Sequence, residues 1–436
     1  MTTILFDATR LLRRGGRLSP TGIDRVVLAY ARWLIQQPDL TLIPVWTWGE
    51  RIIRIRDQRF EAVMRSTLAA CSDDQRPHHP QWPRLADALR ATGEDGLGIR
   101  PNAPSAAQGR GLAKRIDISL RFMRSFGAMR LQPGATYINV GHSGLERPQL
   151  LAGLDGVGVR SVIMIHDLIP IIYPEFCGPG AAERHHNRLE ATLDHASAIL
   201  TNSEATALAV RDHAARESRR VPPIFVAPLG LEPSFLAPSS EPFATVPYFV
   251  CVGTIEPRKN LVFLLKLWRR LAERMGPSTP RLVLVGRRGW ENETVLDHLQ
   301  RSPPVRQFVH EIADLRDDEL ATLIGGARAL LAPSAAEGFD LPVLEALALS
   351  TPVIASDIPA HQELAHGAVL IDPTDGPGWF REITAAIARP RRRPTAFAAP
   401  TWSEHFKIVE QALLPGDSGG LSGEALDQSK PRTRRG

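Results

Sequence analysis

Short apolar runs alternate with segments of helical periodicity along most of the chain, and they do so in two series. In the first series the apolar runs lie at residues 4–6, 40–46, 136–140, 161–165, 198–201 and 224–226. In the second series they lie at residues 248–252, 281–285, 307–309, 329–332, 351–355 and 369–371. Runs of this length joined by helices are typical of parallel sheets that are covered on both faces. The sequence therefore predicts an α/β protein with two Rossmann-like, doubly wound domains.

The segments between these runs carry apolar residues three or four positions apart, which predicts helices at 23–35, 260–274 and 341–349. Around residues 232–245 the chain turns to Pro, Ser and Ala, a composition typical of an interdomain linker. We therefore expect a first domain at 1–238, a second domain at 239–398, and a C-terminal helix at 399–414 that returns to the first domain. The tail at 415–436 is rich in Gly, Ser and Arg and is expected to be disordered.

Residues of about 50–135 interrupt the first series. They contain a Pro-rich polar stretch at 73–83 and a loose stretch at 93–111, with few strand signals. Structureless loops of this length are uncommon inside a compact core. We expect this region to be an insertion on the first domain that is mobile in part.

Composition excludes several classes of protein. The 436 residues are 43% hydrophobic and 23% charged, as in ordinary globular proteins. Cys71, Cys177 and Cys251 lack metal-ligand spacing, which argues against a disulfide framework or a structural zinc and favours the cytoplasm. The N-terminus does not resemble a secretion signal, and no apolar run reaches the roughly 18 to 20 residues that span a bilayer.

The strongest local motif is EGFDLPVLEA at 337–346, which follows a predicted strand and opens a helix. Its loop amides and the first helical N–H groups are expected to form a site for a diphosphate and for sugar hydroxyls. Gly338 allows a ligand to approach the backbone closely. Glu337 and Glu345 can accept hydrogen bonds from sugar or ribose hydroxyls, although a glutamate at a helix start is also common capping chemistry.

A second motif, GTIEPRKN at 253–260, also follows a predicted strand and opens a helix. Arg258 and Lys259 then lie near a helix amino terminus, where the helix dipole disfavours cations unless an anion is present. The diphosphate of a sugar donor would supply that anion, and the cations would neutralise the leaving group without a metal. A solvated Arg–Lys pair with Glu256 as its partner is the alternative.

Together, these motifs resemble those of the family 4 glycosyltransferases, which are retaining enzymes of the group 1 type. Their GT-B fold has two Rossmann-like domains that face a central cleft. The resemblance covers most of residues 1–415 in layout, and its specific motifs lie at about 250–365. It implies a hexosyltransferase of bacterial polysaccharide assembly that moves a sugar from a GDP- or UDP-sugar to a saccharide or lipid-linked acceptor. The layout of residues 21–26 resembles members that use GDP-mannose. No cofactor and no metal are expected.

The resemblance also implies roles for individual residues. Glu337 is expected near the 3-hydroxyl of the transferred sugar, Glu345 at the nucleotide ribose, and the N–H groups of Phe339 and Asp340 at the sugar. The residues expected to take part in catalysis are Arg258, Lys259, Glu337 and His166. The residues expected to bind the donor are Gly22, Gly253, Gly338, Phe339, Asp340, Leu341, Val343, Leu344 and Glu345.

The first domain matches the family in part. Gly22 lies in the stretch SPTGIDRV at 19–26, which resembles the family's glycine loop. His166 opens the motif HDL, where family members place a histidine beside the donor sugar, although a hydrogen-bonded core histidine is the alternative. The stretch NSE at 202–204 also fits the family. Residues 50–135 match nothing in it, so the acceptor site remains unassigned.

The resemblance implies front-face attack, in which the departing phosphate assists deprotonation of the acceptor. Arg258 and Lys259 would then stabilise the transition state and Glu337 would position the sugar. A covalent intermediate on Glu337 is the alternative mechanism. Two other classes remain open, a GT-B phosphorylase or nucleotide-sugar epimerase and a non-catalytic nucleotide-sugar-binding protein.

The net charge of +5 suits anionic partners, and basic residues cluster at 110–130, 389–393 and 430–435. Within 110–130 they interleave with apolar residues. Such a basic amphipathic helix can lie on the inner face of an anionic membrane, as a lipid-linked acceptor would favour, or it can pack on the core. Only 6% of residues are aromatic, and they are not interleaved with basic ones, which argues against nucleic acid.

Overall fold

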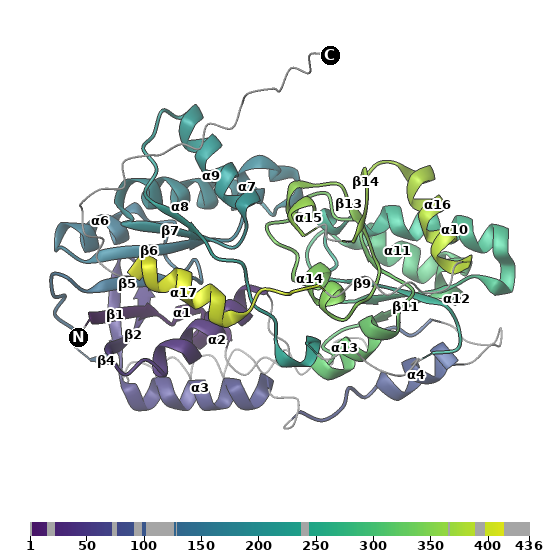
Figure 1. Cartoon of the computed structure of the whole chain (residues 1–436), viewed down its shortest axis with the longest axis horizontal. Helices are drawn as coiled ribbons and strands as arrows, with labels where there is room; N and C mark the ends of the chain where they lie inside the picture. The colour runs from purple at the N-terminus through teal and green to yellow at the C-terminus, as the bar shows by residue number, and fades with distance from the viewer. Residues whose placement is uncertain are drawn as a thin grey trace, which may run out of the picture.

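The computed structural model describes residues 2–14, 22–71, 76–90, 98–101, 126–127, 129–236, 244–364, 367–388 and 397–413. Within this part of the chain, two sheets form two lobes side by side (Figure 1). The first sheet has eight strands in the order β4-β3-β2-β1-β5-β6-β7-β8, and the second has six in the order β11-β10-β9-β12-β13-β14. Both sheets are covered by helices, so the predicted α/β class is confirmed.

The first lobe carries mostly parallel strands with buried side chains on both faces. Its strands are β1 (Thr2–Asp7), β2 (Leu40–Trp48), β3 (Arg51–Ile55), β4 (Phe126–Gly127), β5 (Thr136–Asn139), β6 (Arg160–Ile165), β7 (Ala198–Thr201) and β8 (Ile224–Val226). Its helices are α1 (Thr9–Arg14), α2 (Gly22–Ile35), α3 (Asp57–Cys71), α6 (Pro148–Gly156), α7 (Ile169–Ile172), α8 (Ala181–His195) and α9 (Glu204–Arg216). The short 3-10 helices η2 (Pro174–Phe176) and η3 (Pro233–Phe235) follow α7 and β8.

The strands of the second lobe pair in parallel throughout. They are β9 (Tyr248–Val252), β10 (Arg281–Val285), β11 (Val309–Ile312), β12 (Leu330–Ala332), β13 (Val353–Ser356) and β14 (Val369–Ile371). The helices that follow them are α10 (Leu261–Met275), α11 (Glu293–Arg301), α12 (Pro303–Phe308), α13 (Asp317–Gly326), α14 (Leu341–Ala348), α15 (Pro359–Glu363) and α16 (Gly376–Ala388). The 3-10 helices η4 (Pro257–Lys259) and η5 (Gly276–Ser278) flank α10.

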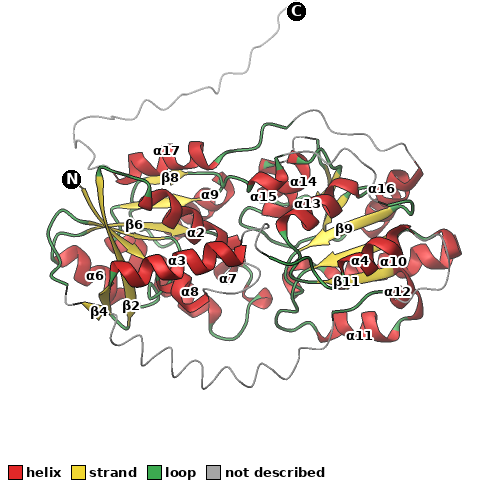
Figure 2. Cartoon of the chain, turned by 90° about the horizontal axis from the view of Figure 1, so that it is seen from below, coloured by secondary structure: helices red, strands yellow, loops and turns green. Residues whose placement is uncertain are grey.

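The last helix, α17 (Trp402–Leu413), crosses back to the first lobe, where it packs against β7 and β8 (Figure 2). The ring of Phe406 stacks on that of Trp33 with 4.5 Å between the ring centroids. His405 shares a 2.8 Å hydrogen bond with the hydroxyl of Tyr30, which is buried in α2. The C-terminal helix therefore belongs to the first lobe, although it follows the second lobe in the sequence.

Buried apolar side chains join the two lobes. One cluster continues from Tyr30 on α2 through Phe235 on η3 to Leu344 on α14. Such a continuous core limits how far the two lobes can separate without exposing apolar surface to water.

The strand expected at 307–309 begins two residues later. Pro303 starts α12, where a proline fits the first helical turn, and this helix runs through residue 308. The strand β11 then continues through the buried polar residues His310 and Glu311. Because these two residues are polar, the strand is not a continuous apolar run in the sequence.

The region 50–135 contains more structure than we expected. A two-residue turn at Gly49 and Glu50 joins β2 to the antiparallel β3. Gly49 has a φ of 65°, which favours glycine and is typical of tight hairpins. The helix α3 then packs under the first lobe (Figure 1).

Residues 76–90 and 98–101 lie on the second lobe and not on the first, where we expected them. This segment contains α4 (Trp82–Arg90), which Figure 1 shows beside the second lobe. The carbonyl of Ile99 accepts a 2.8 Å hydrogen bond from the N–H of Glu311 on the edge strand β11. The guanidinium of Arg100 donates to the carbonyls of Val309 and Leu299 at 2.6 and 3.0 Å. The segment therefore ties the first half of the chain to the outer edge of the second sheet.

Several predictions lie outside the described residues, namely most of the basic stretch 110–130, the basic clusters at 389–393 and 430–435, and the tail at 415–436. In the part of the chain that is described, no helix has the length and apolarity that a bilayer crossing requires.

Candidate functional site

A cavity of about 510 Å³ lies between the two lobes. It opens at the carboxyl ends of β6, β9, β10 and β12, the edge at which doubly wound sheets bind their ligands. The residues predicted to form the site line this cavity, with the exception of Val343 and Leu344. The two motifs of the second domain, distant in the sequence, thus meet at one place.

Val343 and Leu344 are fully buried on the inner side of α14. Both belong to the apolar cluster that joins the lobes. The N–H of Val343 donates to the carbonyl of Asp340 within the first helical turn, at 3.0 Å. Because their side chains are packed away from the cavity, we no longer assign these two residues to donor binding.

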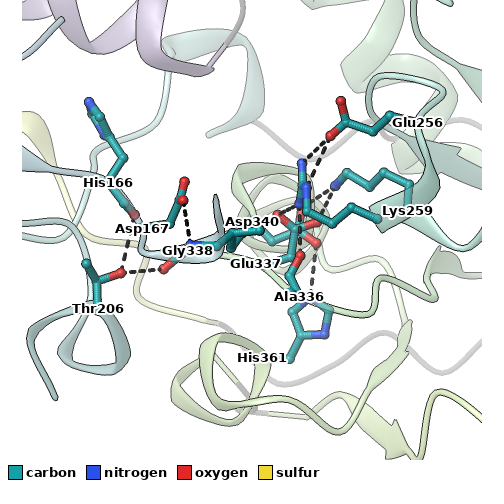
Figure 3. A network of polar contacts seen from close by, with 12 residues as sticks. His166, Asp167, Thr206, Glu256, Lys259, Ala336, Glu337, Gly338, Asp340 and His361 are labelled. Carbon is teal, nitrogen blue, oxygen red and sulfur yellow. Dashed lines mark hydrogen bonds and ion pairs between the residues drawn. The ribbon is translucent and has the colours of Figure 1, made fainter. Parts of the chain in front are cut away.

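Arg258 and Lys259 bind the same carboxylate, that of Glu337 (Figure 3). The Nζ atom of Lys259 lies 2.7 Å from Oε1 of Glu337, and the guanidinium of Arg258 pairs with Oε2. Arg258 also donates to the carboxylate of Glu256 at 2.7 Å and to the carbonyl of Ala336 at 2.9 Å. The two cations therefore already have protein anions beside them, and a diphosphate is not needed to explain their position.

The chain path around Lys259 depends on glycine. Gly253, at the end of β9, has a φ of 146°, and a Cβ there would lie 2.6 Å from Cε of Lys259. A Cβ on Gly286, at the end of β10, would lie 1.9 Å from the carbonyl oxygen of Gly253. Glycine at both strand ends thus lets the lysine side chain turn back into the cavity.

Asp340 extends the charged network towards His361. One oxygen of Asp340 lies 3.4 Å from Nζ of Lys259, and the other lies 2.9 Å from Nε2 of His361. The Nδ1 atom of His361 is hydrogen bonded to the carbonyl of Ser356 at 2.8 Å. His361 was missed in the sequence because a single histidine on the short helix α15 has no spacing that relates it to the motif.

Opposite charges keep this network ionised although it is buried. Burial alone would raise the pKa of Glu337 and of Asp340, but the neighbouring cations outweigh it and hold both values below their usual range. Burial would likewise lower the pKa of Lys259, yet Asp340 and Glu337 raise it. The pKa of His361 is raised, against burial, by its hydrogen bond with Asp340. The site therefore contains fixed charges of both signs.

Glu345 faces the first lobe. It is buried in α14, and its Oε1 atom lies 3.2 Å from a guanidinium nitrogen of Arg25 on α2. The other terminal nitrogen of Arg25 lies 2.6 Å from the carboxylate of Asp317. Burial raises the pKa of Glu345 to about 7, against the charge of Arg25. Arg25 stood within the predicted glycine loop, but the sequence did not distinguish it from its neighbours.

Gly22 begins α2 and lines the cavity, although residues 19–21 before it are not described. A Cβ on Gly22 would have Cδ1 of Leu341 as its nearest neighbour at 3.7 Å, which is ordinary contact. Packing alone therefore does not demand glycine at this position.

His166 lines the cavity and is also hydrogen bonded within the core. Its Nε2 atom lies 2.8 Å from the carbonyl oxygen of Val140, and burial lowers its pKa to about 4. A carbonyl only accepts hydrogen bonds, so Nε2 carries the proton and Nδ1 is an acceptor. His166 can therefore be a hydrogen-bonded core histidine and still offer Nδ1 to a sugar in the cavity. Asp167, the next residue, also lines the cavity and was not singled out in the sequence.

Gly338 lies in close contact with the first lobe. A Cβ there would lie 2.3 Å from the carbonyl oxygen of His166. The hydroxyl of Ser203, which also caps α9, donates to the carbonyl of Gly338 at 2.6 Å. Glycine is therefore required at this position by the approach of the first lobe, whereas we had expected a ligand to be the reason.

A group of potential metal ligands lies outside the cavity. His186 and Glu190 on α8 and His213 on α9 have ligand atoms within 4.8 Å of one another. Glu190 is already paired with Arg219. The Nε2 atom of His213 lies 3.3 Å from Oε1 of Glu190. Among the described residues that line the cavity, no such group is found.

Two parallel-sheet lobes around a charged cleft define the GT-B fold of nucleotide-sugar glycosyltransferases. The structure of Anabaena HepE in complex with UDP and glucose aligns with a TM-score of 0.56 at 14% identity, over 95% of this chain and 96% of that chain. Sucrose-phosphate synthase from Thermosynechococcus elongatus aligns with a TM-score of 0.55 at 16% identity, over 95% of each chain. These likenesses establish the fold.

The sequence of the second lobe narrows the class. Residues 246–389, which carry Arg258, Lys259, Glu337 and Glu345, match the family model for glycosyl transferases group 1. The second lobe is therefore a group 1 glycosyltransferase domain, as its motifs predicted.

Its relatives include mannosyltransferases of bacterial O-antigen assembly. The serotype-specific mannosyltransferase WbdA of Escherichia coli is 28% identical over 240 residues, which are 50% of this chain and 29% of that protein. The O-antigen chain mannosyltransferase RfbU of Salmonella typhimurium is 35% identical over 140 residues, 31% of this chain and 37% of that protein. The chain thus spans less than two thirds of the length of these relatives.

Proposed function

We propose that this protein is a retaining mannosyltransferase of polysaccharide assembly. It would transfer mannose from a nucleotide-sugar donor, GDP-mannose in the first instance, to a saccharide or lipid-linked acceptor. Relatives that are named as mannosyltransferases support the choice of sugar. The complex of Anabaena HepE with UDP, which has the same fold, supports a nucleotide in the cleft.

The observation that carries this proposal is the contact of Arg258 and Lys259 with Glu337 at the ends of β9 and β12. Lys259 is buried and Arg258 is half-buried, so their attraction for an anion is only partly screened by water. Phosphate oxygens that enter the cavity would compete with Glu337 for these cations. Glu337, once released in part, would accept hydrogen bonds from hydroxyls of the sugar.

The same groups would stabilise the transition state. As the bond between the anomeric carbon and the phosphate oxygen breaks, negative charge grows on the departing diphosphate, where Arg258 and Lys259 would neutralise it. The acceptor hydroxyl would attack from the same face and give its proton to the departing phosphate. His166, which is neutral, would offer Nδ1 as an acceptor to a sugar hydroxyl.

The remaining donor contacts come from the wall of the cavity. Glu345 would accept a hydrogen bond from the ribose. The backbone around the start of α14 would face the sugar and the diphosphate. The residues that we retain for donor binding are Gly22, Gly253, Gly338, Phe339, Asp340, Leu341 and Glu345.

We also propose that residues 1–238 and 239–398 act as acceptor-side and donor-side domains. A cytoplasmic site of action, at the inner face of the membrane, would fit a lipid-linked acceptor and the unpaired Cys177 and Cys251.

The test is a panel of GDP- and UDP-sugars incubated with the purified chain and mannose oligosaccharides. We expect release of GDP from GDP-mannose and a product with an α-anomeric linkage, as NMR would show. Tight binding of nucleotide sugars without release of any nucleotide would overturn catalysis in favour of a binding protein. A β-linked product from an α-linked donor would overturn retention.

A further inference from the structure

A second, smaller cavity of about 260 Å³ adjoins the one between the lobes. The two cavities share part of their walls, which consists of Asp167, Glu256, Arg258, Glu337 and Gly338. A ligand bound in the small cavity and a ligand bound in the large cavity would therefore contact the same side chains from opposite sides. If the large cavity holds the donor, as proposed above, the shared wall is where the transferred sugar must leave it.

The small cavity has an aromatic side chain from each lobe. Phe176 comes from η2 of the first lobe, and Trp290 follows β10 in the second, and both are half-buried. Tyr173 packs on Phe176 with 6.0 Å between the ring centroids and is itself 38% exposed. An aromatic surface open to solvent binds the apolar face of a sugar ring well, since Tyr and Trp offer large contact area with a polar edge.

The polar side chains of the small cavity are mostly acidic. Three carboxylates, of Asp167, Glu256 and Glu337, line it together with the single cation Arg258. Of the described residues, three further charged ones line the large cavity but not the small one: Lys259, Arg25 and Glu345, which is proposed to bind the ribose. This charge balance disfavours a diphosphate in the small cavity and favours a neutral ligand with many hydroxyl donors.

A hydrogen bond from the backbone holds the carboxylate of Asp167 in one orientation. Its Oδ1 atom accepts a 3.0 Å hydrogen bond from the N–H of Ile169, at the start of α7. Figure 3 shows Asp167 between His166 and the loop that carries Glu337. Asp167 therefore stands between the two cavities, where the acceptor hydroxyl would have to pass.

We propose that the small cavity is the acceptor subsite and that it binds a neutral saccharide residue, with Trp290 and Phe176 against the sugar ring and Asp167 accepting a hydrogen bond from the attacking hydroxyl. This assignment rests on the proposed transferase function. In the reaction, the hydroxyl oxygen bonds to the anomeric carbon, the bond to phosphate breaks, and the proton goes to the departing phosphate. Asp167 orients the hydroxyl and does not keep its proton.

The experiment compares the wild type with Trp290→Ala, Trp290→Phe and the control Trp48→Ala, whose side chain is 64% exposed on β2. Mannobiose is the acceptor probe and GDP-mannose is the donor. We expect Trp290→Ala to raise the acceptor KM by about ten-fold or more and Trp290→Phe by about two- to three-fold. Donor KM and donor hydrolysis without acceptor should stay within about two-fold of the wild type.

An unchanged acceptor KM in Trp290→Ala, or a parallel rise in donor KM, would overturn the assignment. Binding is measured separately, by saturation-transfer NMR of mannobiose in the presence of GDP. We expect saturation transfer in the wild type and its loss in Trp290→Ala, and no transfer in the wild type overturns the acceptor subsite. Mannobiose binding that depends on Trp290, without turnover of any donor, would refute the transferase function and leave the binding site standing.

Discussion

Arg25 on α2 of the first lobe and Glu345 on α14 of the second lie 3.2 Å apart across the cleft. The side chain of Glu345 is 4% exposed, and that of Arg25 is 15% exposed. Burial raises the pKa of Glu345 to about 7, although Arg25 favours its charged form. The contact between the lobes therefore contains a carboxyl group that changes charge close to neutral pH.

The first prediction concerns the pH dependence of stability. The native chain keeps a proton on Glu345 up to about pH 7, whereas the unfolded chain releases it near the ordinary value of 4.5. This group's contribution to the free energy of unfolding is thus full below about pH 4.5 and is lost as the pH rises to 7. Glu345→Gln should remove the dependence, so its stability relative to the wild type should improve by on the order of 1–3 kcal/mol from pH 4.5 to pH 8.

Urea unfolding at several pH values measures this difference. Glu410→Gln, at an exposed position on α17, is the control and should leave the pH profile of the wild type unchanged. A profile for Glu345→Gln that runs parallel to that of the wild type would show that Glu345 titrates normally.

The second prediction concerns the coupling between Arg25 and Glu345. In a double-mutant cycle with Arg25→Met and Glu345→Gln, we expect a coupling energy of about 1–3 kcal/mol, because the two groups touch in a poorly solvated place. Arg32→Met on the same helix serves as the control, since its 3.8 Å pair with Glu232 is more exposed. Strict additivity of the two changes, measured by urea unfolding, would mean that the pair contributes nothing.

The third prediction concerns the cation next to Glu337. Lys259→Ala should lower kcat for transfer by about 10²- to 10³-fold, the usual effect of removing one group that stabilises growing negative charge. Lys266→Ala on the exposed side of α10 should leave kcat unchanged. Initial rates of GDP release, measured after circular dichroism has confirmed folding, decide the outcome. Equal rates for the two variants would exclude Lys259 from leaving-group stabilisation.

The fourth prediction concerns Gly338. An alanine Cβ would lie 2.3 Å from the carbonyl oxygen of His166, so Gly338→Ala must move the lobes apart or distort the loop. We expect a loss of about 1–3 kcal/mol in the free energy of unfolding, together with lower activity. Gly153→Ala on α6 is the matched control, because a Cβ there meets nothing within 4 Å. The control should be neutral or slightly stabilising, and equal stability of both variants would contradict the close contact.

The fifth prediction concerns residues 98–101 on the second lobe. Arg100→Ala would leave the carbonyls of Val309 and Leu299 without this donor, at a cost of about 1–3 kcal/mol. Hydrogen exchange of β11 should accelerate, whereas exchange of β6 in the first lobe should not. The exposed Arg301→Ala on α11 provides the control. Unchanged exchange in β11 would show that the segment does not protect this edge.

Much of the fold could be predicted from local pattern. The strands at 198–201, 224–226, 248–252, 281–285 and 369–371 have the predicted bounds. They are short apolar runs between helical segments, and that pattern depends only on neighbours in the sequence. Where buried residues are polar, as at His310 and Glu311 in β11, the same pattern fails.

Parts of the site had no local signal. His361 is a single histidine whose spacing does not relate it to the motifs. Arg25 and Asp167 lie inside the stretches SPTGIDRV and HDL, but the sequence did not distinguish them from their neighbours. Their roles depend on which residues of other elements they contact in the folded chain. The placement of residues 98–101 on the second lobe likewise had no local signal, because it depends on hydrogen bonds to β11.

The sequence by itself determined the α/β class, the two motifs of the second domain and the family to which they belong. Only the tertiary structure decided that Glu337 serves as the anion for Arg258 and Lys259, and that Gly338 is required by the first lobe. The physical reason is the distance along the sequence between the residues that interact. Strand and helix patterns arise from residues a few positions apart, whereas ion pairs and close backbone contacts form between residues that only folding brings together.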